Sequence, residues 1–351
     1  MAVPGFTQLR SSAAALAADL PRDLGFAVRT ALAALLALYL AMRLDLDTPH
    51  WAAWTVLTVS LPSPDHAFAK SFYRMVGTLV GAAMGVAFVA LFAQAPLVFD
   101  AAMAIWAAVC VYFGTKARQF ATYAFALTWL TTGIVAYGSI ADPAGAFTVA
   151  ITRTAEVTLG VVCAGLAAAV FAGHRSGGLD HAQSPVPGQA NRNAVRALLA
   201  IGLASLFWYV SQWENGPDFV LMSGAAVMLF AAHPHKLAAT LGLLRGFLLG
   251  TVLGLFVRFA LFTQGAGFET EALILLPCLI LGGLGVADPR TQGPATGYNL
   301  AFMLAADPAN VLNFDLDAAL NTDTAMIAGV LVSVATFLGF VPIRDLIRRT
   351  A

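Results

Sequence analysis

The sequence predicts an all-α polytopic membrane protein of about twelve transmembrane helices, built as two parallel six-helix repeats. Hydrophobic residues make up 59% of the chain and charged residues only 11%, whereas charged residues are about a quarter of a typical soluble domain. The hydrophobic residues gather in segments, many of which reach the roughly 20 residues that a helix needs to cross a bilayer. A repeated glycine spacing divides these segments into two similar halves.

Twelve apolar segments follow one another along the chain. Those of the first half cover roughly 24–42, 51–62, 71–93, 96–114, 119–138 and 146–172. Those of the second half cover roughly 195–213, 217–232, 238–263, 269–287, 294–306 and 319–341. The second, eighth and eleventh are too short to cross the hydrocarbon core. Interrupted helices of this kind are expected where the backbone is buried or lines a cavity.

Glycine recurs at every fourth position in the third and ninth segments. The residues are Gly77, Gly81 and Gly85 in the third, and Gly246, Gly250 and Gly254 in the ninth. This spacing puts the glycines on one helical face, where a neighbouring helix can approach closely, so helix packing is their expected role. The sequence Ala-Asp-Pro-Ala also occurs twice, at 141–144 and 306–309. We interpret the chain as a duplicated unit, an architecture typical of transporters.

Charged residues that lie in or flank the loops between the apolar segments separate by sign. One set of loops carries Lys70, Arg74, Lys116, Arg118, Arg175, Arg192, Arg196, Lys236, Arg245, Arg290, Arg344, Arg348 and Arg349, and the other carries Asp45, Asp47, Asp142, Glu214, Asp218, Glu269, Glu271, Asp307, Asp315 and Asp317. Because basic loops stay in the cytoplasm, both termini are predicted to be cytoplasmic. An even number of spans in each half makes the repeats parallel and excludes an inverted repeat.

These boundaries give five regions. They are a cytoplasmic N-terminal segment at 1–23, a first repeat at 24–172, a linker at 173–194, a second repeat at 195–342 and a cytoplasmic tail at 343–351. The linker is rich in Gly, Ser and Pro and lacks apolar periodicity, which predicts a flexible connection.

Several function classes find no support in the composition. Basic and acidic residues are equal in number, 19 of each, so no basic field favours nucleic acid. The three cysteines lie in apolar segments without metal-ligand spacing, and His233 and His235 have no further ligand near them in sequence. We therefore predict no metal and no cofactor. The sequence shows no nucleophile paired with a base and no phosphate-binding loop, so these patterns do not indicate an enzyme.

Ionisable residues inside apolar segments are the first candidates for function, since charge in a bilayer is costly. Arg153 and Glu156 share a helical face, with Arg153 about 10 Å from the helix start at roughly 1.5 Å per residue. They form either a self-neutralising pair or an anion-attracting arginine tuned by a glutamate. Asp323 lies in the matching part of the last segment, and its pairing with Arg153 is a hypothesis.

Further charged residues lie near the ends of segments. Arg29 and Arg196 each come early in the first helix of a half, so they either snorkel to the surface or place positive charge at a cytoplasmic entrance. Arg258 is expected to snorkel outward. His66 and His235 precede the two glycine-rich helices and are either solvated loop histidines or proton carriers.

Aromatic residues accompany the short segments. Trp54, Tyr123 and Tyr298 would stack on a flat organic substrate if they face inward. Trp51 fits an interfacial aromatic belt.

Three stretches resemble the fusaric acid resistance (FUSC) and aromatic acid exporter family. They are 49–59 with Pro62 and Arg74 beyond it, 153–156 leading to Gly160, and 298–315 with Gly329 and Pro342 after it. The resemblance covers essentially all twelve segments. It implies a pump of the bacterial inner membrane that exports small aromatic carboxylic acids with the proton motive force. The candidate substrate contacts are then Arg29, Arg153, Arg196, Trp54, Thr58, Tyr123 and Tyr298, and the candidate proton carriers are Glu156, Asp323, His66 and His235.

The resemblance also implies partners: membrane lipid, a small organic anion, a periplasmic membrane-fusion adaptor and a small membrane subunit. Whether two copies form a homodimer stays open. Larger family members carry cytoplasmic domains after each half, whereas here the linker is short and the chain stops at Ala351, so this chain resembles a short form. Two alternative functions remain: a passive anion channel and a non-transporting membrane scaffold of an envelope complex.

Overall fold

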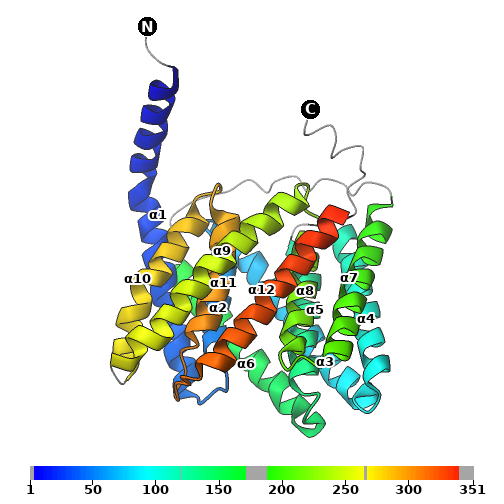
Figure 1. The fold of residues 1–351 in the computed structure, drawn as a ribbon. Helices are drawn as coiled ribbons and strands as arrows, with labels where there is room; N and C mark the ends of the chain where they lie inside the picture. Colours follow the sequence, from blue (N-terminus) through cyan, green and yellow to red (C-terminus); the bar gives the residue numbers. More distant parts are fainter. Residues whose placement is uncertain (1–3, 119, 171–187, 265–266, 340–351) are drawn as a thin grey trace.

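The chain is described by a computed structural model over residues 4–118, 120–170, 188–264 and 267–339, drawn in Figure 1. Within these ranges every regular element is a helix. The first half contains α1 (Pro4–Arg43), α2 (His50–Val59), α3 (Pro64–Phe92), α4 (Pro96–Lys116), α5 (Phe120–Gly138), a 3₁₀ turn (Pro143–Gly145) and α6 (Ala146–Val170). The second half contains α7 (Gln189–Ser211), α8 (Gly216–Phe230), α9 (Lys236–Phe256), α10 (Phe268–Ala287), α11 (Gln292–Ala306) and α12 (Leu316–Gly339).

The prediction of an all-helical polytopic membrane protein is confirmed. Nine helices in the described part of the chain are long and apolar enough to cross a membrane. The others are α2, with 10 residues, and α8 and α11, with 15 each, and these match the three segments expected to be short. Proline explains two of their ends: Pro62 follows α2, and Pro308 follows α11, because proline restricts the residue before it and cannot continue a helix.

Three helices begin six or more residues earlier than the apolar pattern predicts: α3, which starts at Pro64 and not near 71, α1 and α7. α1 is one helix from Pro4, of which 22–43 is apolar enough to span, and its first part projects beyond the bundle in Figure 1. α7 begins at Gln189, inside the stretch predicted as the linker at 173–194. Apolar periodicity marks only the membrane part of a helix, whereas alanine-rich or polar helix formers extend it past the bilayer. Residues 171–187 and 340–351 lie outside the described residues.

The N-terminal end of α1 and the C-terminal end of α12 lie at the same end of the bundle in Figure 1. We name this the proximal end, and the opposite end, where α1 ends and α12 begins, the distal end. This arrangement agrees with the prediction that the termini share one side. Which side faces the cytoplasm stays a prediction.

The glycine-rich helices each pack against the helix two places further along the chain. A Cβ atom on Gly81 of α3 would lie 2.5 Å from the carbonyl oxygen of Thr128 on α5. A Cβ atom on Gly254 of α9 would lie 2.8 Å from the Cβ of Ala305 on α11. Backbones approach this closely only where side chains are absent. The pairing recurs in both halves, and the two-repeat arrangement itself stays a prediction.

The apolar core forms two main groups, and each contains helices from both halves of the chain. One joins buried residues of α1, α2, α10 and α11, and the other joins buried residues of α4, α5, α7 and α8. Figure 1 shows these groups on opposite sides of the bundle. The middle of the bundle, between the two groups, is lined by residues from both halves of the chain.

Candidate functional site

A cavity of about 740 Å³ lies between the two core groups. Its lining residues come from α2, α3, α5, α8, α9, α10, α11 and α12 and from the turn that comes after α9. Along α5 the lining extends from Tyr123 to Gly138, and along α11 from Gln292 to Ala305, which is about 20 Å at 1.5 Å per residue. The cavity therefore extends through most of the roughly 30 Å depth of a hydrocarbon core.

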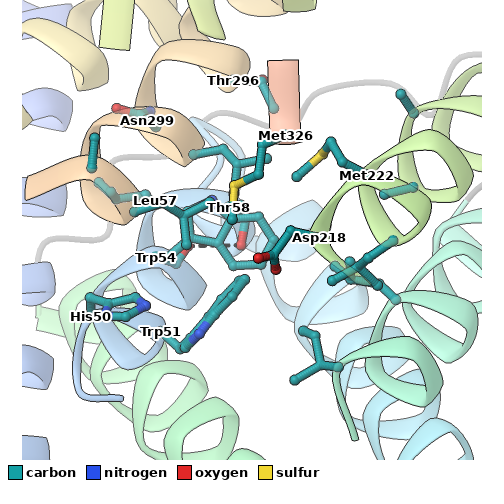
Figure 2. Close-up of a pocket in the computed structure, with 18 of the residues that line it drawn as sticks. His50, Trp51, Trp54, Leu57, Thr58, Asp218, Met222, Thr296, Asn299 and Met326 are labelled. Carbon is teal, nitrogen blue, oxygen red and sulfur yellow. Dashed lines mark hydrogen bonds between the residues drawn. The ribbon is translucent and has the colours of Figure 1, made fainter. Parts of the chain in front are cut away.

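The middle of the cavity is apolar and its two ends are polar. Leucine and methionine side chains from facing helices form the middle, with Leu57, Met222 and Met326 visible in Figure 2. Lys70 and Tyr123 line the proximal part, whereas Asp218, Asp307 and Asp323 line the distal part. Such a space accepts a small molecule with an apolar body and a polar group.

Tryptophan side chains of α2 form an aromatic wall. Trp51 and Trp54 are one helical turn apart, so both face the cavity, and their rings meet edge to face with centroids 5.0 Å apart. Trp51, which the sequence suggested for an interfacial belt, lines the cavity from the start of a short helix whose residues are mostly buried.

A buried arginine stands behind each tryptophan. The guanidinium carbon of Arg153 lies 3.6 Å from the ring centroid of Trp51, and that of Arg74 lies 4.6 Å from the centroid of Trp54. Both side chains are almost fully buried, with exposed fractions of 3% and 1%. Cation–π contacts of this kind strengthen when water is excluded, so the arginines hold the aromatic wall in place.

Glu156 contacts both Arg153 and the loop between α1 and α2. Its Oε1 accepts hydrogen bonds from the backbone N–H of Thr48 at 3.0 Å and from the Thr48 hydroxyl at 2.6 Å, and its Oε2 lies 3.5 Å from Arg153. Arg153 and Glu156 therefore form a buried pair behind the wall, and neither lines the cavity. This matches the self-neutralising alternative.

Asp323 of α12 lines the distal part of the cavity and is 6% exposed. The hypothesised pair of Asp323 with Arg153 is not among the ion pairs of the described residues. One oxygen of Asp323, Oδ2, is buried without a hydrogen-bond partner.

The distal part of the cavity also contains a charge cluster that joins the two halves. Asp307 Oδ1 lies 3.2 Å from His50 Nδ1, and Asp307 Oδ2 lies 3.3 Å from Arg258. Arg258 also donates from Nε to the carbonyl oxygen of Asn313 at 2.7 Å. Burial alone would raise the pKa of Asp307, but the close contact with His50 and the His50 and Arg258 charges hold it below its usual value.

The expectation that Arg258 snorkels outward is wrong. Arg258 is 7% exposed, lines the cavity and lies in a single π-helical turn (Val257–Leu261) that continues α9. A π turn inserts an extra residue into a helix and rotates the side chains beyond it. A regular 3.6-residue period, which sequence reasoning assumes, could not place this side chain inward.

The remaining candidates from the sequence divide into those that line the cavity and those that lie apart from it. Trp54, Thr58, Tyr123 and Asp323 line it. Tyr298 is buried in the α1–α11 core and donates its hydroxyl to the Cys278 carbonyl oxygen at 3.1 Å. Arg29, Arg196, His66 and His235 do not line it. In the described residues, no group of three or more histidine, cysteine and acidic side chains has metal-binding geometry.

Comparison with known proteins gives one family. The sequence model of the fusaric acid resistance protein family matches residues 23–184 and again residues 174–350. Among curated proteins, p-hydroxybenzoic acid efflux pump subunits AaeB of Escherichia coli O157:H7 and Shigella boydii serotype 18 are each 30% identical over 158 residues. These matches cover 42% of this chain and 24% of each relative. No solved structure matches the chain significantly.

Proposed function

Because the chain belongs to the fusaric acid resistance protein family, we propose that it is an efflux transporter of small aromatic carboxylic acids. The observation that carries the proposal is the long cavity with a tryptophan wall at its side and a lysine at its proximal part. An aromatic ring fits between Trp54 and the apolar middle, and a carboxylate finds positive charge nearby. The matched relatives are named for export of p-hydroxybenzoic acid, which supports this substrate class.

We place the protein in the bacterial inner membrane with both termini cytoplasmic. The basic residues of the proximal loops support this orientation. The relatives are named as pump subunits, which supports association with an adaptor or a small membrane subunit. The two family matches, one in each half, support a duplicated unit.

Proton coupling completes the proposal. Ionisable side chains within a membrane domain commonly mark proton paths. Asp323 faces the cavity with an oxygen that lacks a hydrogen-bond partner, so it is the carboxyl group best placed to bind and release a proton beside the substrate. Glu156 is engaged by Thr48 and Arg153 and has a positioning role instead. The histidines at 66 and 235 lie away from the cavity.

The test is uptake of labelled p-hydroxybenzoate into inverted membrane vesicles with an imposed proton gradient. We expect accumulation that a protonophore abolishes. Trp54→Ala should reduce uptake at low substrate by about three- to tenfold, the usual value of an aromatic contact, and Trp54→Phe should restore much of it. Trp213→Ala, which removes a tryptophan outside the cavity, is the matched control.

Two outcomes would contradict the proposal in different ways. Uptake that persists after the gradient collapses would indicate the passive channel. No uptake of any aromatic acid above that of vesicles without the protein would favour the scaffold.

A further inference from the structure

The proximal corner of the cavity holds two basic side chains and no carboxylate. Arg74 is 1% exposed, and Lys70 lines the cavity. Neither belongs to an ion pair with an acidic residue in the described part of the chain. The acidic residues that line the cavity are Asp218, Asp307 and Asp323, all on its distal side. Buried cations without a counter-charge are costly, so the corner favours an anion from outside the protein.

Hydrogen bonds in this corner leave donors facing the cavity. Arg74 Nη1 donates to the Tyr123 hydroxyl oxygen at 2.7 Å, and Nη2 donates to the Thr55 hydroxyl at 2.9 Å. Since the Tyr123 oxygen accepts from an arginine, its own hydrogen is left to donate, either to the neighbouring Thr58 hydroxyl or to a ligand in the cavity. The Lys70 ammonium lies 5.2 Å from the centroid of the same ring and carries three further donors.

The Thr58 hydroxyl, which also lines the cavity, has no hydrogen left to donate to a ligand. It lies 3.0 Å from the carbonyl oxygen of Trp54 and 2.9 Å from that of Thr55, so its hydrogen is already used. It can accept a hydrogen bond but not donate one to a carboxylate. The donors of the corner are therefore Lys70 and Tyr123.

We propose that Lys70 and Tyr123, with Arg74 behind them, form an anion subsite that holds the carboxylate of the transported molecule. The proposal rests on the proposed function and adds a binding direction: the carboxylate points to the proximal end, and the ring lies against Trp54 toward the apolar middle. The carboxylates on the distal side disfavour the reverse direction by repulsion. The ligand class is a flat ring carrying one carboxylate.

The test is calorimetric binding of benzoate and of its neutral isostere benzamide to the purified full-length protein. Lys70→Met should weaken benzoate binding by about 10- to 100-fold, since a charge-assisted hydrogen bond is lost, and should leave benzamide binding unchanged. Tyr123→Phe should weaken benzoate binding by about two- to tenfold. Lys116→Met is the matched control, because the Lys116 ammonium also lies over a tyrosine ring, 4.3 Å from the centroid of Tyr112, but outside the cavity. Thermal melting of each variant separates lost binding from lost folding.

The outcomes separate this proposal from efflux. Benzoate binding that is unchanged in Lys70→Met, or that falls equally for benzamide, overturns the subsite even if uptake of p-hydroxybenzoate continues. Binding that depends on Lys70 without any uptake supports the subsite and contradicts the efflux proposal. Wild-type protein that does not prefer benzoate to benzamide overturns the subsite as well.

Discussion

At the residue scale, the buried charges behind α2 stabilise the fold, and their contribution to the free energy of unfolding can be measured. Arg153 neutralises Glu156, which in turn accepts two hydrogen bonds from Thr48. Arg153→Met leaves a buried carboxylate without its cation and should lower the free energy of unfolding by about 3 kcal/mol. The double variant Arg153→Met with Glu156→Gln removes both charges and keeps an acceptor for Thr48, so it should be more stable than the single variant. Thermal melting in detergent measures both, and equal melting of the two variants would contradict the pairing.

The sequence spacing of Arg153 and Glu156 predicted this pair because residues three apart share a helical face. The cation–π contact of Arg153 with Trp51 was beyond prediction, since it joins α6 to α2 across the fold. The same limit applies to Lys70 and Arg74. In the sequence, their positive charge indicated only which loops face the cytoplasm. Their missing counter-charge becomes visible once the surrounding helices are placed.

Asp307 gives a prediction that depends on pH. Its pKa lies below the usual value because of the contacts with His50 and Arg258, so its charged form contributes stability above the ordinary carboxyl range, and this contribution is lost as the pH falls through the lowered pKa. Asp307→Asn retains a side chain that tolerates the left-handed backbone conformation at φ 45°. We expect the variant to melt below the wild type at about pH 7 and the gap to shrink toward about pH 3. A gap that is constant over this range would contradict the ionic role of Asp307.

At the element scale, the glycine faces of α3 and α9 set how closely their partner helices pack. Gly81→Ala places a methyl group 2.5 Å from the carbonyl oxygen of Thr128, so α3 and α5 must move apart and the melting temperature should fall. Gly165→Ala on α6 meets nothing within 4 Å and should raise stability slightly, because alanine is favoured over glycine in a helix by about 0.5–1 kcal/mol. If both variants shift the melting temperature in the same direction, close packing at Gly81 is not the cause.

The periodicity of the sequence was sufficient for the number and order of the elements. Each of the twelve apolar segments corresponds to a helix, and the three short ones are α2, α8 and α11. Helix ends outside the apolar stretch were not predictable in this way, as α1 and α7 show. The π turn at Val257–Leu261 left no periodic signal, so the inward position of Arg258 was missed.

At the scale of the whole molecule, the cavity separates two packed groups of helices that each draw on both halves of the chain. Two similar halves of a sequence suggest a route between one half and the other. Here the route lies between two groups of helices, and each group contains helices from both halves of the chain. For the proposed transport, we expect motion of one packed group against the other to open the cavity alternately toward its proximal and distal ends, as in transporters of repeated architecture.

The orientation of this route predicts opposite labelling of two cavity residues. Gln292 near the proximal end and Ala318 near the distal end both line the cavity and are exposed. With Cys110, Cys163 and Cys278 replaced by alanine, a membrane-impermeant thiol reagent should label Ala318→Cys in right-side-out vesicles and Gln292→Cys in inverted vesicles. Excess p-hydroxybenzoate should slow both reactions, because the substrate occupies the same space. The reverse pattern of labelling would contradict cytoplasmic termini, and labelling of both residues from one side would indicate an open passage and contradict alternate opening of the cavity.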